Sequence, residues 1–156
     1  MILVDADACP VKREIVAAAI RREMTVVMVA GGFLRLPEHP LVRLFVAGEG
    51  FDAADDAIAA VAGPGTLVAT ADVPLMARAV AAGAAVLDFR GREMTPANVG
   101  EIAATRDLMA ELRPGIEGMT GGQGGGPKPY GPLDRAAFKN ALDRVLTRMA
   151  RARPSG

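Results

Sequence analysis

The chain has 156 residues, 51% of them hydrophobic, and its 18 Lys and Arg balance its 18 Asp and Glu, which excludes a protein that attracts nucleic acid through a global positive field. One cysteine excludes an internal disulfide and, with a single histidine, argues against a structural zinc site. No stretch reaches the ~18 uninterrupted apolar residues of a transmembrane helix, so we expect a soluble, cytoplasmic protein without a membrane partner.

Short apolar runs alternate with helical patterns along most of the chain. The runs predict five strands, ILVD, TVVMVA, LVRLFVA, TLVATA and AAVLDF, at residues 2–5, 25–30, 41–47, 66–71 and 84–89. The intervening and following segments predict helices at residues 10–23, 52–62, 72–83 and 95–112. Strands separated by helices of this length form a mostly parallel sheet with helices on its faces, so the predicted fold class is α/β.

The last part of the chain differs from the rest in composition. Residues 114–131 are rich in Gly and Pro and predict a loop, and residues 132–152 predict an amphipathic helix. The apolar stripe of that helix consists of Phe138, Leu142, Val145 and Met149. We interpret the chain as a single domain with an α/β core at 1–113.

The charges are unevenly distributed along the chain. Residues 1–127 hold 11 Lys/Arg against 16 Asp/Glu, and residues 128–156 hold 7 Lys/Arg against 2 Asp/Glu. This difference suggests a cation site beside an anion-attracting surface.

Acidic residues follow several of the predicted strands. Asp5 ends the first strand, Asp7 lies just beyond it, Asp72 follows the fourth strand and Asp88 ends the fifth. Asp55 lies in the first turn of the second predicted helix, on its inward face. Ligands of open parallel sheets bind at the carboxyl ends of the strands, so we expect these five carboxylates to gather at one edge.

A cation would explain this gathering. Two carboxylates at i and i+2 disfavour each other's charge unless something positive lies between them. Oxygen ligands without His or Cys select Mg²⁺ or Mn²⁺, so the sequence predicts such a site. Individual acids have simpler interpretations, since Asp52 and Asp72 suit helix N-caps and Asp56 suits a solvated surface. Capping does not explain Asp5, which closes an apolar strand with no helix directly after it.

Five motifs are spread over nearly the whole chain: VDADACP at 4–10, DAADD at 52–56, TADVPLMARAV at 70–80, RG at 90–91 and GGPKPYGPLDRAAF at 125–138. As a set they resemble the YaiI/YqxD family of bacterial proteins, which is assigned to the PIN-like, nuclease-related folds. The resemblance implies a Rossmann-like (PIN-like) sheet and, through the relation to PIN domains, a metal-dependent ribonuclease site.

The resemblance also implies roles for particular aspartates. Asp5 matches the acid at the end of the first PIN strand, and Asp72 matches the acid of the Thr-x-Asp motif. Asp55, or its neighbour Asp56, matches the acid on the central helix, and Asp88 falls where PIN domains often place a fourth acid. These five residues are therefore the candidate ligands of Mg²⁺ or Mn²⁺.

The implied reaction is hydrolysis of a phosphodiester, in single-stranded RNA, by metal-bound water. Asp7 belongs to the family motif although not to the general PIN pattern. The candidate catalytic residues are Asp5, Asp7, Asp55 and Asp72. The candidate phosphate-contacting residues are Arg90, Arg92, Lys128 and Arg135.

Two other functions stay open at this stage. Asp-x-Asp after an apolar strand also opens haloacid-dehalogenase-type phosphatases, in which Asp5 would be the nucleophile and Asp7 the general acid. A phosphatase built on Cys9 is disfavoured because its Cys-x5-Arg loop would need Arg where the chain has Ile15. The other open function is a non-catalytic module that binds metal or RNA.

Overall fold

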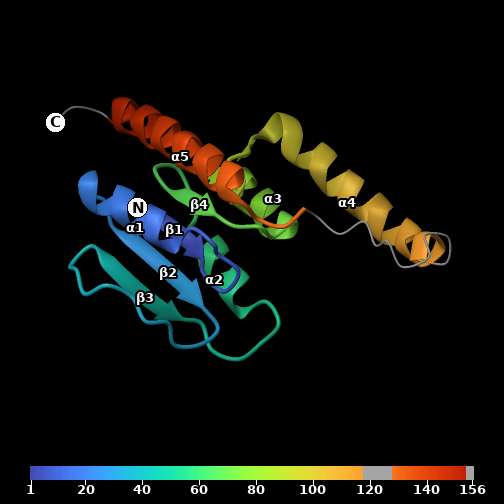
Figure 1. Ribbon diagram of the computed structural model, residues 1–156, viewed down its shortest axis with the longest axis horizontal. Helices are drawn as coiled ribbons and strands as arrows, with labels where there is room; N and C mark the ends of the chain where they lie inside the picture. The colour runs from blue at the N-terminus through green and yellow to red at the C-terminus, as the bar shows by residue number, and fades with distance from the viewer. Residues whose placement is uncertain (118–127, 154–156) are drawn as a thin grey trace.

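The computed structural model describes residues 1–117 and 128–153, except for the side chains of residues 110 and 113–117. One sheet runs through this part of the chain. In these residues the strands are β1 (Ile2–Asp5), β2 (Val26–Ala30), β3 (Val42–Val46), β4 (Leu67–Ala69), β5 (Ala85–Leu87) and β6 (Glu93–Met94). The helices are α1 (Lys12–Arg21), α2 (Ala53–Val61), α3 (Val73–Ala81), α4 (Pro96–Glu117) and α5 (Pro132–Ala152) (Figure 1).

The order of the strands in the sheet is β3-β2-β1-β4-β5-β6. The first five strands are parallel, and β6 pairs antiparallel with β5. The chain builds the sheet outward from β1 to β3 and then returns to add β4 and β5 on the other side of β1. The fold is therefore a Rossmann-like α/β sheet, as predicted, and its strand order reverses between β1 and β4.

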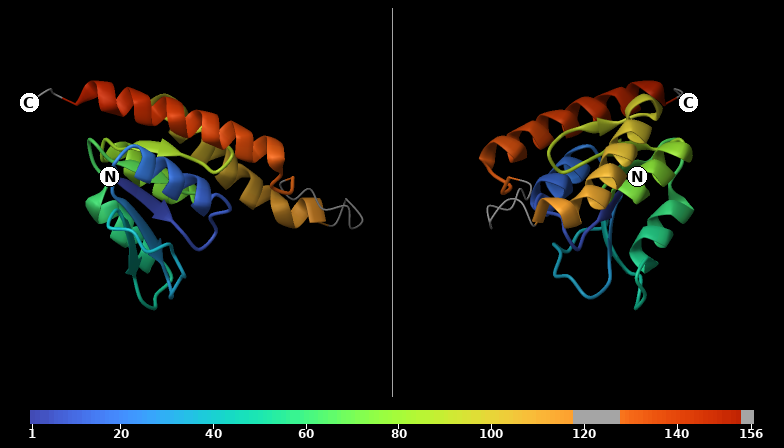
Figure 2. Two further views of the ribbon diagram at one scale, coloured as in Figure 1. Left: turned by 60° about the vertical axis from the view of Figure 1, so that its left-hand side comes forward. Right: turned by 90° about the vertical axis from the view of Figure 1, so that its right-hand side faces the viewer.

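Alternating side chains of each strand build two apolar layers. Ile2 and Val4 of β1 pack in the layer covered by α1 and α5, whereas Leu3 packs in the layer covered by α2, α3 and α4. Figures 1 and 2 show α5 lying beside α1 on one side of the sheet, with α2 and α3 on the other. This alternation follows directly from the period of two in a strand.

The C-terminal helix is part of the core. Phe138 is fully buried, and its ring lies against the ring of Phe89, with centroids 6.4 Å apart. The predicted stripe of α5 is confirmed: Phe138, Leu142 and Val145 are buried, and Met149 packs against the core at its edge.

The turn between β5 and β6 contacts the backbone of α5. Gly91 has a φ of +89°, and a Cβ atom on it would lie 2.6 Å from the carbonyl oxygen of Ala137. Glycine is therefore required both by the backbone conformation and by the close approach. Further along α5, Arg148 pairs with Glu93 of β6 at 2.7 Å.

The structure differs from the sequence prediction at several element ends. The predicted strands omit β6, because two residues are too few to show an alternating pattern. Helix α4 extends to Glu117, into the predicted loop at 114–131, although the Pro and Gly of that stretch are disfavoured inside a helix, and this preference is the basis of the predicted loop. The GGQGGGP run of that loop lies outside the described residues. In the described part of the chain, no helix is both long and apolar enough to cross a bilayer.

We predict that Phe138→Ala destabilises the fold by about 3–5 kcal/mol, because it leaves a cavity where a fully buried ring packs against Phe89 in the layer between the sheet and α5. Thermal and urea unfolding would measure the loss. Leu133→Ala, at a position of α5 that is 87% exposed, is the matched control and should change stability by less than about 0.5 kcal/mol. A Phe138→Ala protein as stable as the wild type would contradict a core role for α5.

Candidate functional site

Two of the predicted aspartates meet where the strand order reverses. Asp5 ends β1, and Asp72 stands between β4 and α3. The parallel register pairs Val4 with Ala69, which places Thr70 beside Asp5 at the edge. The hydroxyl of the fully buried Thr70 donates a hydrogen bond to Oδ2 of Asp5 at 3.0 Å and accepts one from the backbone N–H of Asp72 at 3.0 Å. One hydroxyl therefore links the two acidic positions.

Asp72 has a second role as a helix cap. Its Oδ1 accepts a hydrogen bond from the backbone N–H of Leu75 at 2.9 Å, so the N-cap interpretation is confirmed. This bond fixes the side chain at the start of α3. Its Oδ2 has no hydrogen-bond partner within the described residues. Asp72 can thus cap α3 with one oxygen and offer the other to a ligand.

Asp55 approaches the same edge from α2. It is partly buried, one turn before the fully buried Ile58. Burial raises the pKa of the Asp55 carboxyl to about 6, and the negative charges of Asp72 and then Asp5 add to this shift. The carboxylates of three separate elements therefore lie near enough to disfavour one another's charge.

Asp5 is in a similar environment. Burial raises the pKa of its carboxyl, and the charges of Asp72 and Asp7 raise it further, while the hydrogen bond from Thr70 opposes the shift. Ionising a carboxyl that is partly out of water and beside other acids costs free energy unless a cation or a hydrogen-bond donor compensates for it. Such sites are candidates for function.

Asp7 lies beside Asp5, which with Asp55 and Asp72 forms the acidic trio, but its carboxylate has a different hydrogen-bond partner. It is exposed in the turn after β1, and its Oδ2 accepts a hydrogen bond from the backbone N–H of Gly31 at 3.0 Å. Asp7 therefore holds the start of the loop that follows β2.

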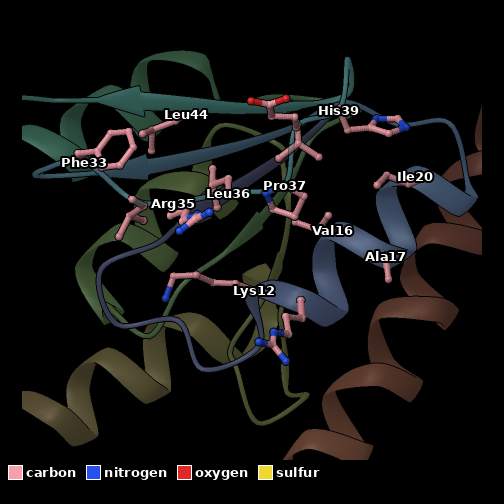
Figure 3. Close-up of a pocket in the computed structure, with 14 residues that line it drawn as sticks. Lys12, Val16, Ala17, Ile20, Phe33, Arg35, Leu36, Pro37, His39 and Leu44 are labelled. Atoms are coloured by element: carbon pink, nitrogen blue, oxygen red, sulfur yellow. The ribbon is translucent and has the colours of Figure 1, made fainter.

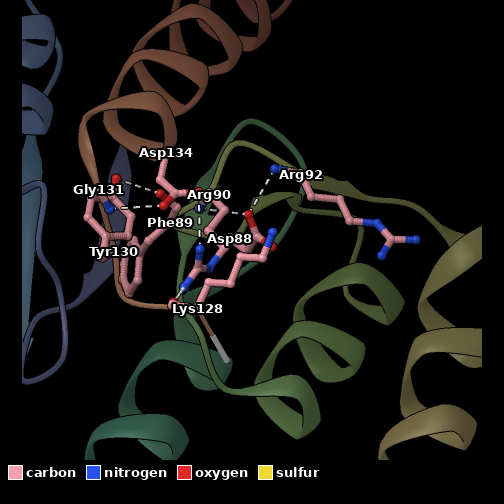
Figure 4. A network of polar contacts seen from close by, with 8 residues as sticks. All are labelled: Asp88, Phe89, Arg90, Arg92, Lys128, Tyr130, Gly131 and Asp134. Atoms are coloured by element: carbon pink, nitrogen blue, oxygen red, sulfur yellow. Dashed lines mark hydrogen bonds and ion pairs between the residues drawn. The ribbon is translucent and has the colours of Figure 1, made fainter. Parts of the chain in front are cut away.

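Asp56 and Asp88 are engaged outside the trio. Asp56 is exposed and pairs with Arg78 of α3 at 2.8 Å. Asp88 accepts hydrogen bonds from the backbone N–H groups of Arg90 at 2.9 Å and Arg92 at 2.8 Å, which shapes the turn before β6 (Figure 4). The structure gives both residues structural partners.

Two of the predicted phosphate-contacting residues form ion pairs with acidic side chains. Arg90 pairs with Asp134 at 3.0 Å, and Arg135 pairs with Glu14 at 2.5 Å. Both guanidinium groups also lie 5.8 Å from the centre of the Tyr130 ring. These contacts tie the segment before α5 to the sheet and to α1.

The other two basic candidates are less constrained. Arg92 and Lys128 are exposed, and their side chains form no ion pair within the described residues. Figure 4 shows the Arg92 side chain extending away from the network around Arg90. The backbone carbonyl of Lys128 accepts a hydrogen bond from Arg90.

The trio fits a divalent cation in its chemistry but is not closed around one. Its donors are hard carboxylate oxygens, as Mg²⁺ and Mn²⁺ prefer. Within the described residues, however, no three acidic, histidine or cysteine side chains are close enough together to hold an ion as they stand. Binding by Asp5, Asp55 and Asp72 would therefore require their side chains to move together.

Cys9 is a buried thiol rather than an exposed nucleophile. Its side chain is 5% exposed, and burial raises its pKa to about 11. The group is therefore protonated at neutral pH, which suits packing.

The sequence interpretation gave Thr70 no role of its own, although Thr70 is the threonine of the Thr-x-Asp motif. The signal was present, because a polar residue closes the apolar run LVAT in step with the inward-facing Val68. A hydroxyl in that position must find a partner once it is buried.

This protein is therefore of the Rossmann-like α/β class, with acidic side chains at the point where the strand order reverses. The chain belongs to the uncharacterized YaiI/YqxD family, whose model matches residues 3–148. This finding confirms the resemblance in the sequence motifs. No solved structure matches the chain.

The relatives share most of their length with this chain. A UPF0178 protein of Jannaschia sp. (strain CCS1) is 48% identical over 150 residues, which cover 96% of this chain and 94% of the relative. A UPF0178 protein of Nitrobacter winogradskyi is 48% identical over 149 residues, covering 96% and 92%. One of Rhodopseudomonas palustris (strain HaA2) is 49% identical over 154 residues, covering 99% and 91%.

We predict that Asp55→Asn stabilises the metal-free protein at neutral pH. The folded state keeps the proton of Asp55 up to about pH 6, whereas the unfolded chain releases it near pH 4, so ionisation opposes folding. Wild-type stability should fall between about pH 4 and 6, and the variant should lack that fall. The gain at pH 7.5 should be on the order of 1 kcal/mol, after allowance for solvent screening.

Thermal unfolding in EDTA between pH 4 and 8 would measure this difference. Asp56→Asn is the matched control, because that carboxylate is exposed and paired with Arg78. A gain for Asp55→Asn that persists unchanged at pH 4, or no gain at pH 7.5, would contradict the electrostatic account.

Proposed function

We propose that this protein is a metal-dependent phosphodiesterase of the ribonuclease type, with Asp5, Asp55 and Asp72 as the ligands of Mg²⁺ or Mn²⁺. The observation that carries the proposal is the position of Asp5 and Asp72 at the switch point, linked by Thr70. Open α/β sheets bind their ligands at this place. Asp55 adds a third carboxylate from α2.

The electrostatics of the trio support a cation as its partner. Asp5 and Asp55 both have a raised pKa, and in each case the neighbouring acids contribute to the shift. A divalent cation would favour the ionised forms and would stabilise the folded protein by binding to it. When bound, the ion would supply Lewis-acid catalysis of phosphodiester hydrolysis by water.

The residues of the chain have distinct tasks in this proposal. Thr70 is a positioning residue, because its hydroxyl orients Oδ2 of Asp5. Asp72 keeps one oxygen on the N–H of Leu75, so its orientation is set by the start of α3. Asp7 stands at the rim of the site, where its Oδ2 is already hydrogen-bonded to Gly31. Asp56 and Asp88, the other two candidate ligands, have less support because Asp56 pairs with Arg78 and Asp88 accepts two backbone hydrogen bonds.

A second candidate function is a binding module without catalysis. It is the alternative if the three carboxylates do not converge on an ion, since within the described residues no three such side chains are close enough to hold one as they stand. The phosphatase with Asp5 as nucleophile and Asp7 as general acid remains a further outcome of the experiments below.

We predict that Mn²⁺ or Mg²⁺ raises the melting temperature of the wild-type protein. The stabilisation should reach about 2.7 kcal/mol when the ion concentration is about 100 times its Kd. Asp5→Asn should reduce the effect strongly, and Asp56→Asn should keep it. No rise in the wild type, or an equal rise in Asp5→Asn, would count against the proposed ligands.

We also predict that the protein with Mn²⁺ cleaves labelled single-stranded RNA. Asp5→Asn and Asp72→Asn should lower the rate about 100-fold or more. Asn can still cap α3, so the second variant tests the lost charge rather than the fold. Cys9→Ser should retain activity, because the thiol is buried and protonated.

A parallel experiment separates the other functions. The protein would be incubated with small phosphomonoesters and with beryllium fluoride. Phosphomonoester turnover with a fluoroberyllate adduct on Asp5, and without RNA cleavage, would establish the phosphatase. Binding of metal or RNA without turnover of either substrate would establish the binding module.

A further inference from the structure

A groove of about 1510 Å³ lies between α1 and the segment from Phe33 to Leu44 (Figure 3). Its apolar floor includes Val16 and Ile20 of α1 and Leu36 on the opposite side. The groove is separate from the acidic trio, and none of its lining residues has a role in the proposed chemistry. It is therefore a candidate binding surface that the proposed chemistry does not explain.

One end of this groove combines positive charge with an exposed aromatic ring. Figure 3 shows Lys12, Phe33 and Arg35 together at one end, with His39 and Ile20 at the other. The ring of Phe33 is 84% exposed. Lys12 and Arg35 form no ion pair in the part of the chain that the structure describes. This end thus presents an apolar ring and the exposed guanidinium of Arg35, with the half-buried Lys12 beside them.

The cationic end adjoins the acidic edge of the sheet. The loop that carries Phe33 and Arg35 is fastened at its start, where the N–H of Gly31 donates to Asp7 at 3.0 Å. The Nζ group of Lys12 donates to the carbonyl oxygen of Cys9 at 2.7 Å, just after the turn that contains Asp7. A chain bound at this end of the groove therefore lies next to the end of β1.

An aromatic ring flanked by cations is suited to a ligand that offers both a flat ring and negative charge. Proteins that bind single strands of nucleic acid stack bases on aromatic side chains and neutralise the phosphates with Lys and Arg. A base paired in a duplex is already stacked on its neighbours and cannot use such a ring. An acidic peptide would satisfy the cations but would leave the exposed ring without a stacking partner.

We propose that Lys12, Phe33 and Arg35 bind a single strand of nucleic acid, with a base stacked on Phe33 and phosphates at Lys12 and Arg35. The bound strand is thereby led toward the edge that carries Asp5 and Asp72. This inference rests on the proposed function, which supplies the reason for a phosphodiester chain to pass that edge. Stacking and phosphate contacts do not separate RNA from DNA, so both are tested.

The test is binding without cleavage. Fluorescence anisotropy in EDTA would compare labelled single-stranded RNA, single-stranded DNA and a duplex of the same sequence. Phe33→Ala should weaken single-strand binding roughly 5- to 150-fold. Arg35→Glu should also weaken it and should reduce the salt dependence by about one released ion. All variants change exposed side chains, and their melting temperatures would verify that they fold.

Two matched controls lie outside the groove. Phe51→Ala removes another fully exposed ring, and Arg43→Glu makes the same charge change on the exposed side of β3. Both should bind as the wild type does. Equal weakening in the controls, equally tight binding of the duplex, or no single-strand binding by the wild type would overturn the proposal. Competition by polyglutamate as effective as that by unlabelled RNA would also overturn it, in favour of an acidic protein partner.

The two proposals can fail separately. Groove-dependent binding in EDTA without RNA cleavage in Mn²⁺ would uphold the groove and reject the phosphodiesterase. Cleavage that is lost in Asp5→Asn but unaffected by Phe33→Ala and Arg35→Glu, with binding also unaffected, would reject the groove and uphold the phosphodiesterase.

Discussion

The parallel pairing of β1 with β4 is the constraint on which the candidate site depends. It joins two strands about 65 residues apart in the chain, and its register sets Asp5 beside Thr70. A shift of one residue would turn Thr70 to the opposite face of the sheet, because side chains alternate along a strand. The buried hydroxyl would then lose Asp5 as its acceptor, and the link to Asp72 would be lost as well. The strand register that packs the core therefore also sets the geometry of the candidate site.

The acids at this edge are not neutralised by Arg78, a basic side chain of α3. Arg78 lies close enough to lower the pKa of Asp55 slightly, but this effect is smaller than the effects of burial and of the neighbouring acids. Its ion pair is with the exposed Asp56 instead. A purely structural acidic cluster would gain from direct pairing, since a partly buried charge is costly without a partner. The arrangement keeps Asp55 available while Arg78 still connects α2 to α3, and this favours a ligand as its missing partner.

The sequence predicts the parts of this structure that depend on local periodicity. The five parallel strands, the helices between them and the buried stripe of α5 all follow from the spacing of apolar residues. It also predicts that acids would reach the carboxyl edge, because strand ends are local features. It does not predict the role of Thr70, which depends on the register of distant strands. Nor does it predict that Arg90 and Arg135 have carboxylate partners in segments far from them in the chain.

The uneven charge of the chain has a different meaning in the folded protein than in the sequence. The basic C-terminal part suggests an anion-attracting surface, yet two of its arginines face acids of the body: Arg135 pairs with Glu14, and Arg148 pairs with Glu93. Pairs in which one partner is exposed, as both arginines are here, contribute only about 0–1 kcal/mol each when solvent screens them, so we assign them mainly to orienting α5 on the core. Two of the seven basic residues of the C-terminal part are therefore matched by acids of the body. Two cations of the groove that form no ion pair within the described residues, Lys12 at the start of α1 and Arg35 in the loop after β2, are better placed to attract an anionic chain than the basic helix is.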